Sequence, residues 1–181
     1  MKISIPKLNA MIRYFATYTN PELLGKKKLM KLFYFSDFTH VKNYASPITY
    51  DNYVHLEHGP IPSTIMNLVS AVENDSDNSL LSDSMSVITK ESSYLKQIVT
   101  LSKFSNKDSE YFSRSELRVL KDVCTRFADK NGKFIEEASH RDSAWSETEE
   151  LENIPYILAV GDDDCKVTEE DIKFAVAVFN K

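Results

Sequence analysis

The sequence predicts an α+β fold that is mainly helical, with a buried central helix and a small antiparallel sheet. The segment 29–44 carries apolar side chains around most of its helical circumference, which is typical of a helix enclosed by others. The segments 85–89 and 97–101 are short and rich in β-branched residues, which favours a hairpin or a small sheet. A chain of 181 residues can bury its own core. We expect a single domain over 1–181, with a core at about 8–145 and a C-terminal helical extension.

The central helix follows a shorter one. Apolar residues recur at helical spacing after Pro6, so a first helix is expected there, ending near Asn20 and Pro21. The central helix should end at Ala45–Pro47, because proline disfavours helical geometry at the residue before it. Its polar residues form one narrow strip, which we expect to face solvent: Lys27, Lys28, Lys31, Thr39 and Lys42.

A strand with two different faces is predicted over 50–58. Its residues alternate, so that Tyr53, His55 and Glu57 share one face and Val54, Leu56 and His58 the other. Val54 and Leu56 are the more apolar set, so we expect them to be buried and the first set to face outward. The predicted hairpin is expected to pair with this strand. A stiff turn ends it at Gly59–Pro62, where Gly59 permits a positive φ and the prolines fix theirs.

The remaining elements are predicted from caps and periodicity. A helix is expected over 63–72, and a solvated loop over 73–79. Ser113 and Glu116 form a capping box for a helix that Asn131–Gly132 should end with a left-handed residue. A short helix over 133–139 follows, then a solvated acidic run at 147–152. The apolar segment at 154–161 is expected to be either extended or a docking arm. Thr168 caps the last helix.

Three motifs resemble those of the SocA-like antitoxin family, which carries the Panacea domain. A helical K-L-x-K-L-x-Y-F motif fits residues 28–35, an H-G-P motif fits 58–60, and an S-H-x-x-x-x-W motif fits 139–145. Their order matches the family, and the resemblance extends over 8–145. Family members often have Trp in the strand before Gly-Pro, where this chain has Tyr53, His55 or Leu56. The motif residues expected to be structural are Leu29, Leu32, Tyr34, Phe35, Gly59, Pro60, His140 and Trp145.

The resemblance implies the antitoxin of a bacterial or phage toxin–antitoxin system, which neutralises a cognate protein toxin by direct binding and catalyses no reaction. The candidate partner-binding residues are Tyr53, His55, Glu57, His58, Lys27, Lys28 and Lys31. An alternative is a protease adaptor, or an accessory protein of a phage or mobile element that binds a host factor. A third reading is a hydrolase that uses Asp37 and His140.

Composition gives no sign of a cofactor or a metal. The formal charge is −5 with two cysteines, Cys124 and Cys165, so neither a nucleic-acid partner nor a disulfide framework is indicated. His55 and His58, three apart on a strand, would point to opposite faces and are poorly placed to share a metal. Asp37 and His40 lie on one helix, either as a proton-handling pair or, more simply, bonded to nearby backbone. With no signal peptide or membrane-spanning run, a cytoplasmic protein is expected.

Overall fold

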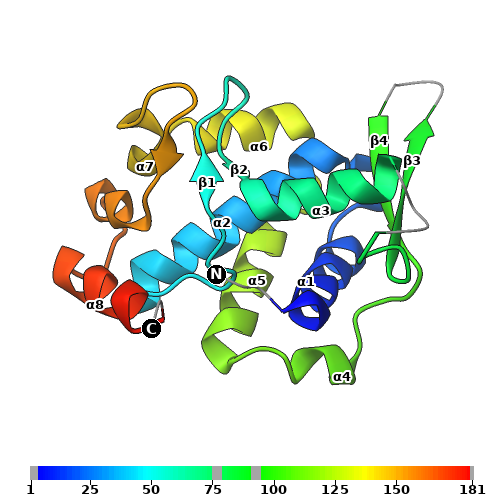
Figure 1. Ribbon diagram of the computed structural model, residues 1–181, viewed down its shortest axis with the longest axis horizontal. Helices are drawn as coiled ribbons and strands as arrows, with labels where there is room; N and C mark the ends of the chain where they lie inside the picture. Colours follow the sequence, from blue (N-terminus) through cyan, green and yellow to red (C-terminus); the bar gives the residue numbers. More distant parts are fainter. Residues whose placement is uncertain (1–3, 75–78, 91–94, 180–181) are drawn as a thin grey trace.

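A long helix, α2, runs through the middle of the molecule, and the other elements surround it (Figure 1). The computed structural model describes residues 4–74, 79–90 and 95–179. The helices are α1 (Ile5–Tyr18), η1 (Pro21–Leu23), α2 (Lys26–Tyr44), α3 (Ser63–Asn74), α4 (Asn106–Ser109), α5 (Arg114–Phe127), α6 (Gly132–Ser139), α7 (Ser143–Ser146), η3 (Tyr156–Gly161) and α8 (Glu169–Phe179). The strands are β1 (Tyr53–Val54), β2 (Ile61–Pro62), β3 (Met85–Lys90), β4 (Leu95–Thr100) and β5 (Asn153–Ile154). The predicted α+β class is confirmed.

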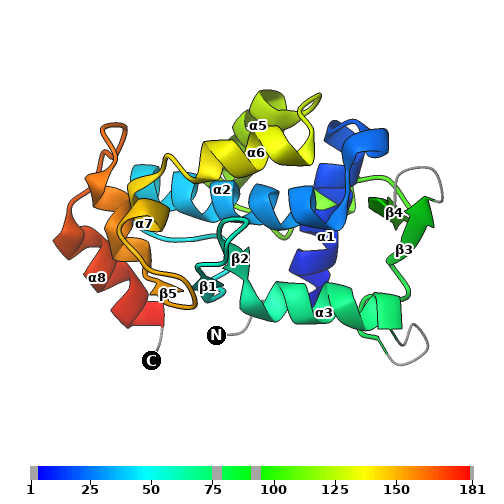
Figure 2. The same cartoon turned by 90° about the horizontal axis from the view of Figure 1, so that it is seen from above.

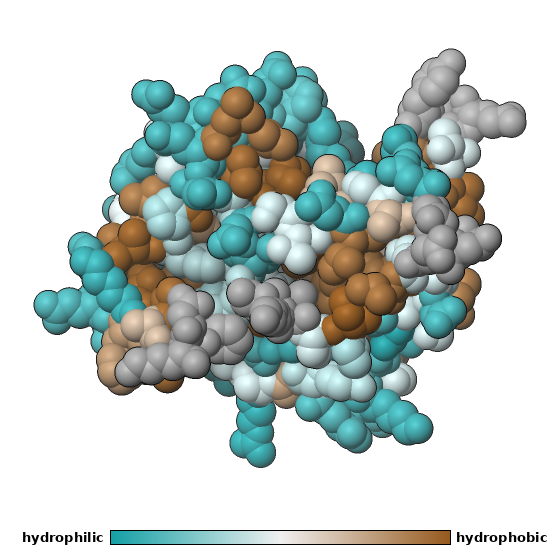
Figure 3. All heavy atoms as spheres, in the orientation of Figure 1, coloured by the Kyte–Doolittle hydropathy of each residue, from teal (hydrophilic) through white to brown (hydrophobic). Residues whose placement is uncertain are grey.

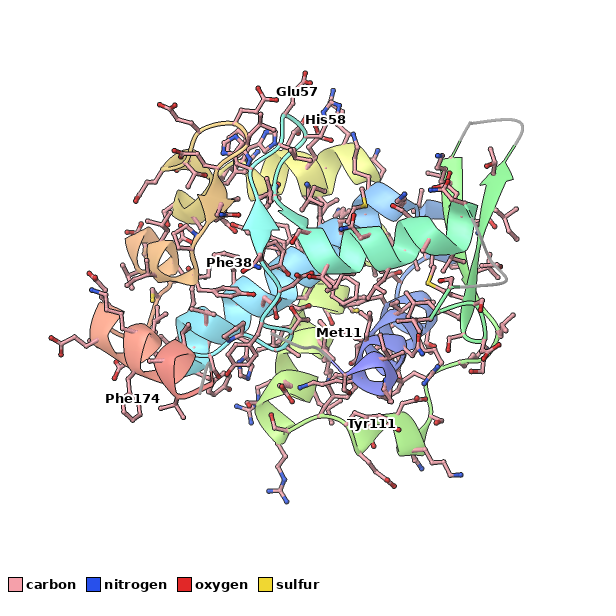
Figure 4. The ribbon with its side chains drawn as sticks, viewed as in Figure 1. Met11, Phe38, Glu57, His58, Tyr111 and Phe174 are labelled. Atoms are coloured by element: carbon pink, nitrogen blue, oxygen red, sulfur yellow. The ribbon has the colours of Figure 1, made fainter. Side chains whose placement is uncertain are left out.

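Helix α2 is enclosed because neighbours cover it on several sides. Helices α5 and α6 lie along one side of it and α3 along the opposite side (Figure 2). Leu29, Leu32, Phe33 and Tyr34 have no exposed surface, as expected for a central helix. Its end is also as predicted, because Ala45 takes a left-handed conformation and terminates it. Figure 4 shows Phe38 of α2 and Met11 of α1 in the interior of the molecule.

The expected solvent-facing strip of α2 is wrong for three of its lysines. Lys28, Lys31 and Lys42 are all buried. Each ammonium group reaches an oxygen at the end of its long stem: Lys28 Nζ donates to Ala128 O (2.9 Å), Lys31 Nζ to Pro60 O (2.8 Å), and Lys42 Nζ to Asp162 Oδ2 (3.2 Å). A lysine can be buried when its charged end keeps such partners. The charge pattern alone therefore mispredicted the exposed side of the helix.

The described residues form two separate antiparallel sheets. The first has the strand order β2-β1-β5, with Tyr53 opposite both Pro62 and Ile154. The second is the β3–β4 hairpin, which confirms the predicted pairing of those two segments. The expected pairing of this hairpin with the Tyr53 strand is wrong. Instead β4 meets the start of α2, where Gly25 bridges Gln97 and Ile98 N donates to Leu24 O (2.9 Å).

Most predicted helix boundaries hold, and two local predictions fail. The capping box of Ser113 and Glu116 opens α5 as expected. Asn131 does not end a helix in a left-handed conformation, because its φ is −78° and its side chain accepts from Phe134 N to start α6. The segment expected to be extended at 154–161 contributes only Ile154 to β5 and then coils into η3.

The chain after residue 146 is built into the same structure. Strand β5 completes the first sheet, and the Tyr156 hydroxyl donates to Asp51 O at 2.7 Å. Lys166 N donates to Lys42 O (2.8 Å), which ties the segment before α8 to the end of α2. Among the described residues, no helix has the length and apolar character that crossing a membrane requires.

Candidate functional site

The three sequence motifs meet around the side chain of Lys31. Lys31 comes from α2, and its Nζ donates to Pro60 O in the β1–β2 loop. Gly59 beside it has a φ of +90°, a conformation that glycine adopts without strain. A Cβ atom placed on Gly59 would lie 2.7 Å from Ser139 Oγ and 3.0 Å from Lys31 Nζ. The loop is thus packed directly between α2 and the end of α6, and no side chain larger than hydrogen fits at position 59.

An indole ring lies between two imidazole rings next to this loop. Trp145 stacks on His140 with ring centroids 4.0 Å apart, and on His55 with centroids 4.3 Å apart. His55 Nδ1 is also 3.0 Å from Thr148 Oγ1. Such offset stacking contributes beyond simple burial. The stack joins β1 to α6 and α7, so it fixes the start of the β1–β2 loop.

Burial lowers the pKa of two basic groups in this cluster, Lys31 and His140. Burial lowers the pKa of Lys31 to about 7, although the charge of Glu136 acts in the opposite direction. Burial also lowers the pKa of His140, so that imidazole is neutral at pH 7. Burial alone would raise the pKa of Glu136, but its bond to Lys27 and the nearby His58 lower it overall. The ionised carboxylate of Glu136 therefore belongs to the same cluster as two bases, Lys31 and His140, whose protonated forms are disfavoured by burial.

Glu136 connects the exposed residues Lys27 and His58 of this cluster. It was not predicted as a site residue from the sequence. Its Oε2 accepts from Lys27 Nζ at 2.8 Å, and its Oε1 lies 3.1 Å from His58 Nδ1. A signal was present in the sequence, because Glu136 precedes His140 by four residues on a predicted helix and so shares its face. Glu136 thereby links α2, the β1–β2 loop and α6.

The predicted partner-binding residues divide into a buried group and an exposed group. Tyr53, with 1 % of its surface exposed, and His55 are buried, as are Lys28 and Lys31. Glu57, His58 and Lys27 are exposed, and Figure 4 shows Glu57 and His58 at the tip of the β1–β2 loop. The period of two correctly grouped Tyr53 with His55, but the inward face was assigned wrongly. Val54 and Leu56, expected to be buried, are only partly covered.

Tyr53 points inward because a buried carboxylate needs its hydroxyl group. The Tyr53 hydroxyl donates to Asp37 Oδ2 at 2.8 Å. Asp37 also accepts from the hydroxyl group of Thr49, and from the backbone N–H groups of Ile48 and Thr49 at 2.8 Å each. Burial raises the pKa of Asp37 to about 6 although these bonds act to lower it. This cluster holds the chain between α2 and β1 in place.

Asp37 and His140, the two residues of the hydrolase hypothesis, are not hydrogen-bonded to each other. Asp37 has no exposed surface, and its hydrogen-bond partners among the described residues do not include His140. His40 lies with Nδ1 against Ser46 O and Nε2 at 3.1 Å from Ser115 Oγ. Asp37 and His40 thus bond to nearby backbone and hydroxyl groups, as the simpler interpretation predicted. Within the described ranges, no three His, Cys, Asp or Glu residues are grouped as metal ligands.

A shallow apolar groove of about 460 Å³ borders the exposed end of the β1–β2 loop. Its apolar lining is Leu56, Ile61 and Met66, and its polar lining is Lys26, Lys27, Glu57, His58, Lys96 and Glu150. In Figure 3 an apolar area is visible over this loop, with hydrophilic residues around it. The groove contains all three exposed candidates of the sequence analysis.

These features define a mainly helical α+β domain in which three separated motifs hold one surface loop. The chain belongs to a family described as "Antitoxin SocA-like, Panacea domain", whose profile matches residues 29–146. That match confirms the resemblance seen in the motifs and covers more than half of the chain. The family description indicates an antitoxin-like role with a protein partner. Comparisons with curated proteins and with solved structures found no match.

Proposed function

We propose that this protein is the antitoxin of a bacterial or phage toxin–antitoxin system, acting in the cytoplasm by binding a cognate protein toxin. The single observation that carries the proposal is the convergence of the three family motifs on the β1–β2 loop. The motif residues are used to hold the loop, and the loop presents Glu57 and His58 at its tip. A rigid, preformed surface loses little entropy on binding, which favours a binding role.

A binding role without catalysis is also supported by the chemistry of the motif residues. The side chain of Lys31 is enclosed and bonded to Pro60 O, and His140 is covered by Trp145. A catalytic acid or base needs access to a substrate atom within hydrogen-bond distance. These groups instead contact other parts of the protein, which supports a structural role for them.

The proposal is tested by a growth assay in the native genetic context. Each small reading frame beside the gene is expressed alone and together with this protein. We expect one of them to arrest growth and the protein to restore it, and the two chains to co-purify. The variant Tyr111→Ala serves as a surface control, because Tyr111 is 46 % exposed and lies far from Glu57 and His58 (Figure 4). If no neighbouring product arrests growth in a way that this protein reverses, the proposal is wrong.

The protease-adaptor alternative is separated by measuring toxin abundance during rescue. Direct neutralisation predicts that the toxin level stays constant while growth recovers. Delivery to a protease predicts that the level falls, and that rescue is lost in cells lacking the protease.

A further inference from the structure

The ionic groups around the groove differ sharply in whether they have partners within the protein. Lys26 Nζ is 3.1 Å from Glu73 Oε2, and Lys96 pairs with the same carboxylate. Lys27 is paired with Glu136 at 2.8 Å. The groove's lysines are therefore already engaged, which weakens their attraction for an outside anion.

The carboxylates at the other end of the groove are unpaired. Glu57 and Glu150 both line it, and neither makes an ion pair with any other described residue. Glu149 and Glu152 flank Glu150 and are likewise exposed. Lys27, Lys28 and Lys31 were predicted to bind the partner, but the groove charges without an ionic partner among the described residues are negative. Complementarity therefore calls for a positively charged partner.

An exposed leucine stands beside these carboxylates in an unusual backbone conformation. Leu151 is 75 % exposed and has a φ of +71°, which leucine rarely adopts. The cause is a bulge at the end of the β1–β5 ladder: His55 N donates to Glu152 O, and Leu151 N donates to His55 O, each at 2.8 Å. Leu151 and Glu152 thus lie opposite the single residue His55, and β-bulges of this kind redirect side chains. Here the bulge exposes an apolar side chain directly after Glu150, which lines the groove.

Taken with the proposed toxin-binding function, on which this inference rests, the geometry points to one kind of occupant. We propose that the groove and Leu151 bind an apolar segment of the partner that carries lysine or arginine residues, with the basic groups placed against Glu57 and Glu150. The apolar side chains of the segment would cover Leu56, Ile61 and Met66. Apolar contact at the centre with charges at the rim is the usual organisation of a protein interface.

The first test uses the toxin identified by rescue with the parent protein, purified and titrated against charge variants. The double variant Glu57→Lys/Glu150→Lys should bind at least tenfold more weakly, and the parent's affinity should fall as salt is added. The control Glu110→Lys/Glu170→Lys makes the same change in net charge at exposed positions, Glu110 directly after α4 and Glu170 on α8. We expect it to bind within about twofold of the parent, since rim charges act locally. Equal loss in both double variants, or tighter binding by the first, would overturn the inference.

The second test separates binding from stability at Leu151. Leu151→Gly removes the side chain and suits the positive φ, so its melting temperature should equal or exceed that of the parent. Its affinity for the toxin should nevertheless fall at least tenfold. Phe174→Ala is the control, because Phe174 is a similarly exposed apolar residue (73 %) on α8 (Figure 4). Parent-like affinity of Leu151→Gly would exclude Leu151 from the interface. Absence of any rescued toxin would instead count against the proposed function itself.

Discussion

At the scale of single residues, position 59 shows how closely the motifs are packed. Gly59 combines a φ of +90° with contact distances that leave no room for a Cβ atom. Gly59→Ala should therefore lower the free energy of unfolding by about 2 kcal/mol or more, from backbone strain and displacement of Lys31. Denaturant unfolding measures this directly.

Gly132→Ala is the matched control for that substitution. Gly132 begins α6 without a positive φ, and a Cβ there would meet only Lys27 Cδ at 3.8 Å. Alanine is the better helix former, so this variant should be at least as stable as the parent. If both alanine variants have the same stability, the loop is less tightly held than we describe.

Lys31 leads to a prediction about pH. Its pKa of about 7 in the folded protein lies below the ordinary value of 10.5, so the unfolded chain binds more protons between these values. Stability must then rise with pH across that window. Relative to Lys31→Met, the parent should gain about 2 kcal/mol of unfolding free energy between pH 7 and pH 9.

The comparison with Lys31→Met removes the contributions of other titrating groups that the two proteins share. Denaturant unfolding of both proteins at pH 7, 8 and 9 provides the measurement. A stability difference that stays constant over the three pH values would show that Lys31 keeps its full charge in the folded state.

At this scale, the important residues could be predicted from the sequence more reliably than whether each of them is buried or exposed. The motif residues Gly59, His140 and Trp145 were found, because their types and spacing are visible in the chain. The burial of Tyr53 was not, since alternation defines two faces but does not say which one meets the core. The burial of Tyr53 depends on Asp37, which is 16 residues away along the chain. The hydrogen bonds of Asp37 to Tyr53 and Thr49 form only when the chain is folded.

At the scale of elements, the stack of His55, Trp145 and His140 joins β1, α6 and α7. Trp145 is partly buried against the core, so Trp145→Ala should cost about 3 kcal/mol through lost packing and a cavity. Trp145→Phe should cost less than half of that, because it keeps a stacked ring. Trp145 Nε1 makes no hydrogen bond to any described residue, so phenylalanine sacrifices none there.

Thermal or denaturant unfolding of the two Trp145 variants distinguishes a stacking role from a surface role. If Trp145→Ala melts like the parent, the stack does not hold these elements together, and Trp145 is better regarded as a contact residue for the partner.

Long helices were more predictable than the short strands. The helices at 5–18, 26–44 and 114–127 can be predicted from apolar periodicity and from residues that start or stop helices, which are local signals. Strands β1, β2 and β5 have two residues each, and the pairing of β1 with β5 joins segments about 100 residues apart. No local pattern encodes such a contact. We therefore predicted that β1 pairs with the β3–β4 hairpin, whereas it pairs with β2 and β5.

At the scale of the whole molecule, the described structure separates the residues that support the site from those available to a partner. Lys31, Gly59, His140 and Trp145 lie within or against the protein, whereas Glu57, His58 and Leu151 face outward. The segment after the family match contributes to both, through β5 and through the bulge at Leu151.

The central claim is that the exposed tip of the β1–β2 loop, Glu57 and His58, binds the toxin and that the buried and packed motif residues, such as Lys31, Gly59 and Trp145, only position it. The most direct measurement is the affinity of the purified cognate toxin for the double variant Glu57→Ala/His58→Ala, compared with the parent and with Tyr111→Ala. Both substituted side chains are exposed, and the lost His58–Glu136 pair is a surface contact worth at most about 1 kcal/mol, so the double variant should stay folded and melt within about 4 °C of the parent. The account predicts at least a tenfold loss of affinity for the double variant and none for Tyr111→Ala. A folded double variant that binds the toxin as tightly as the parent would contradict it.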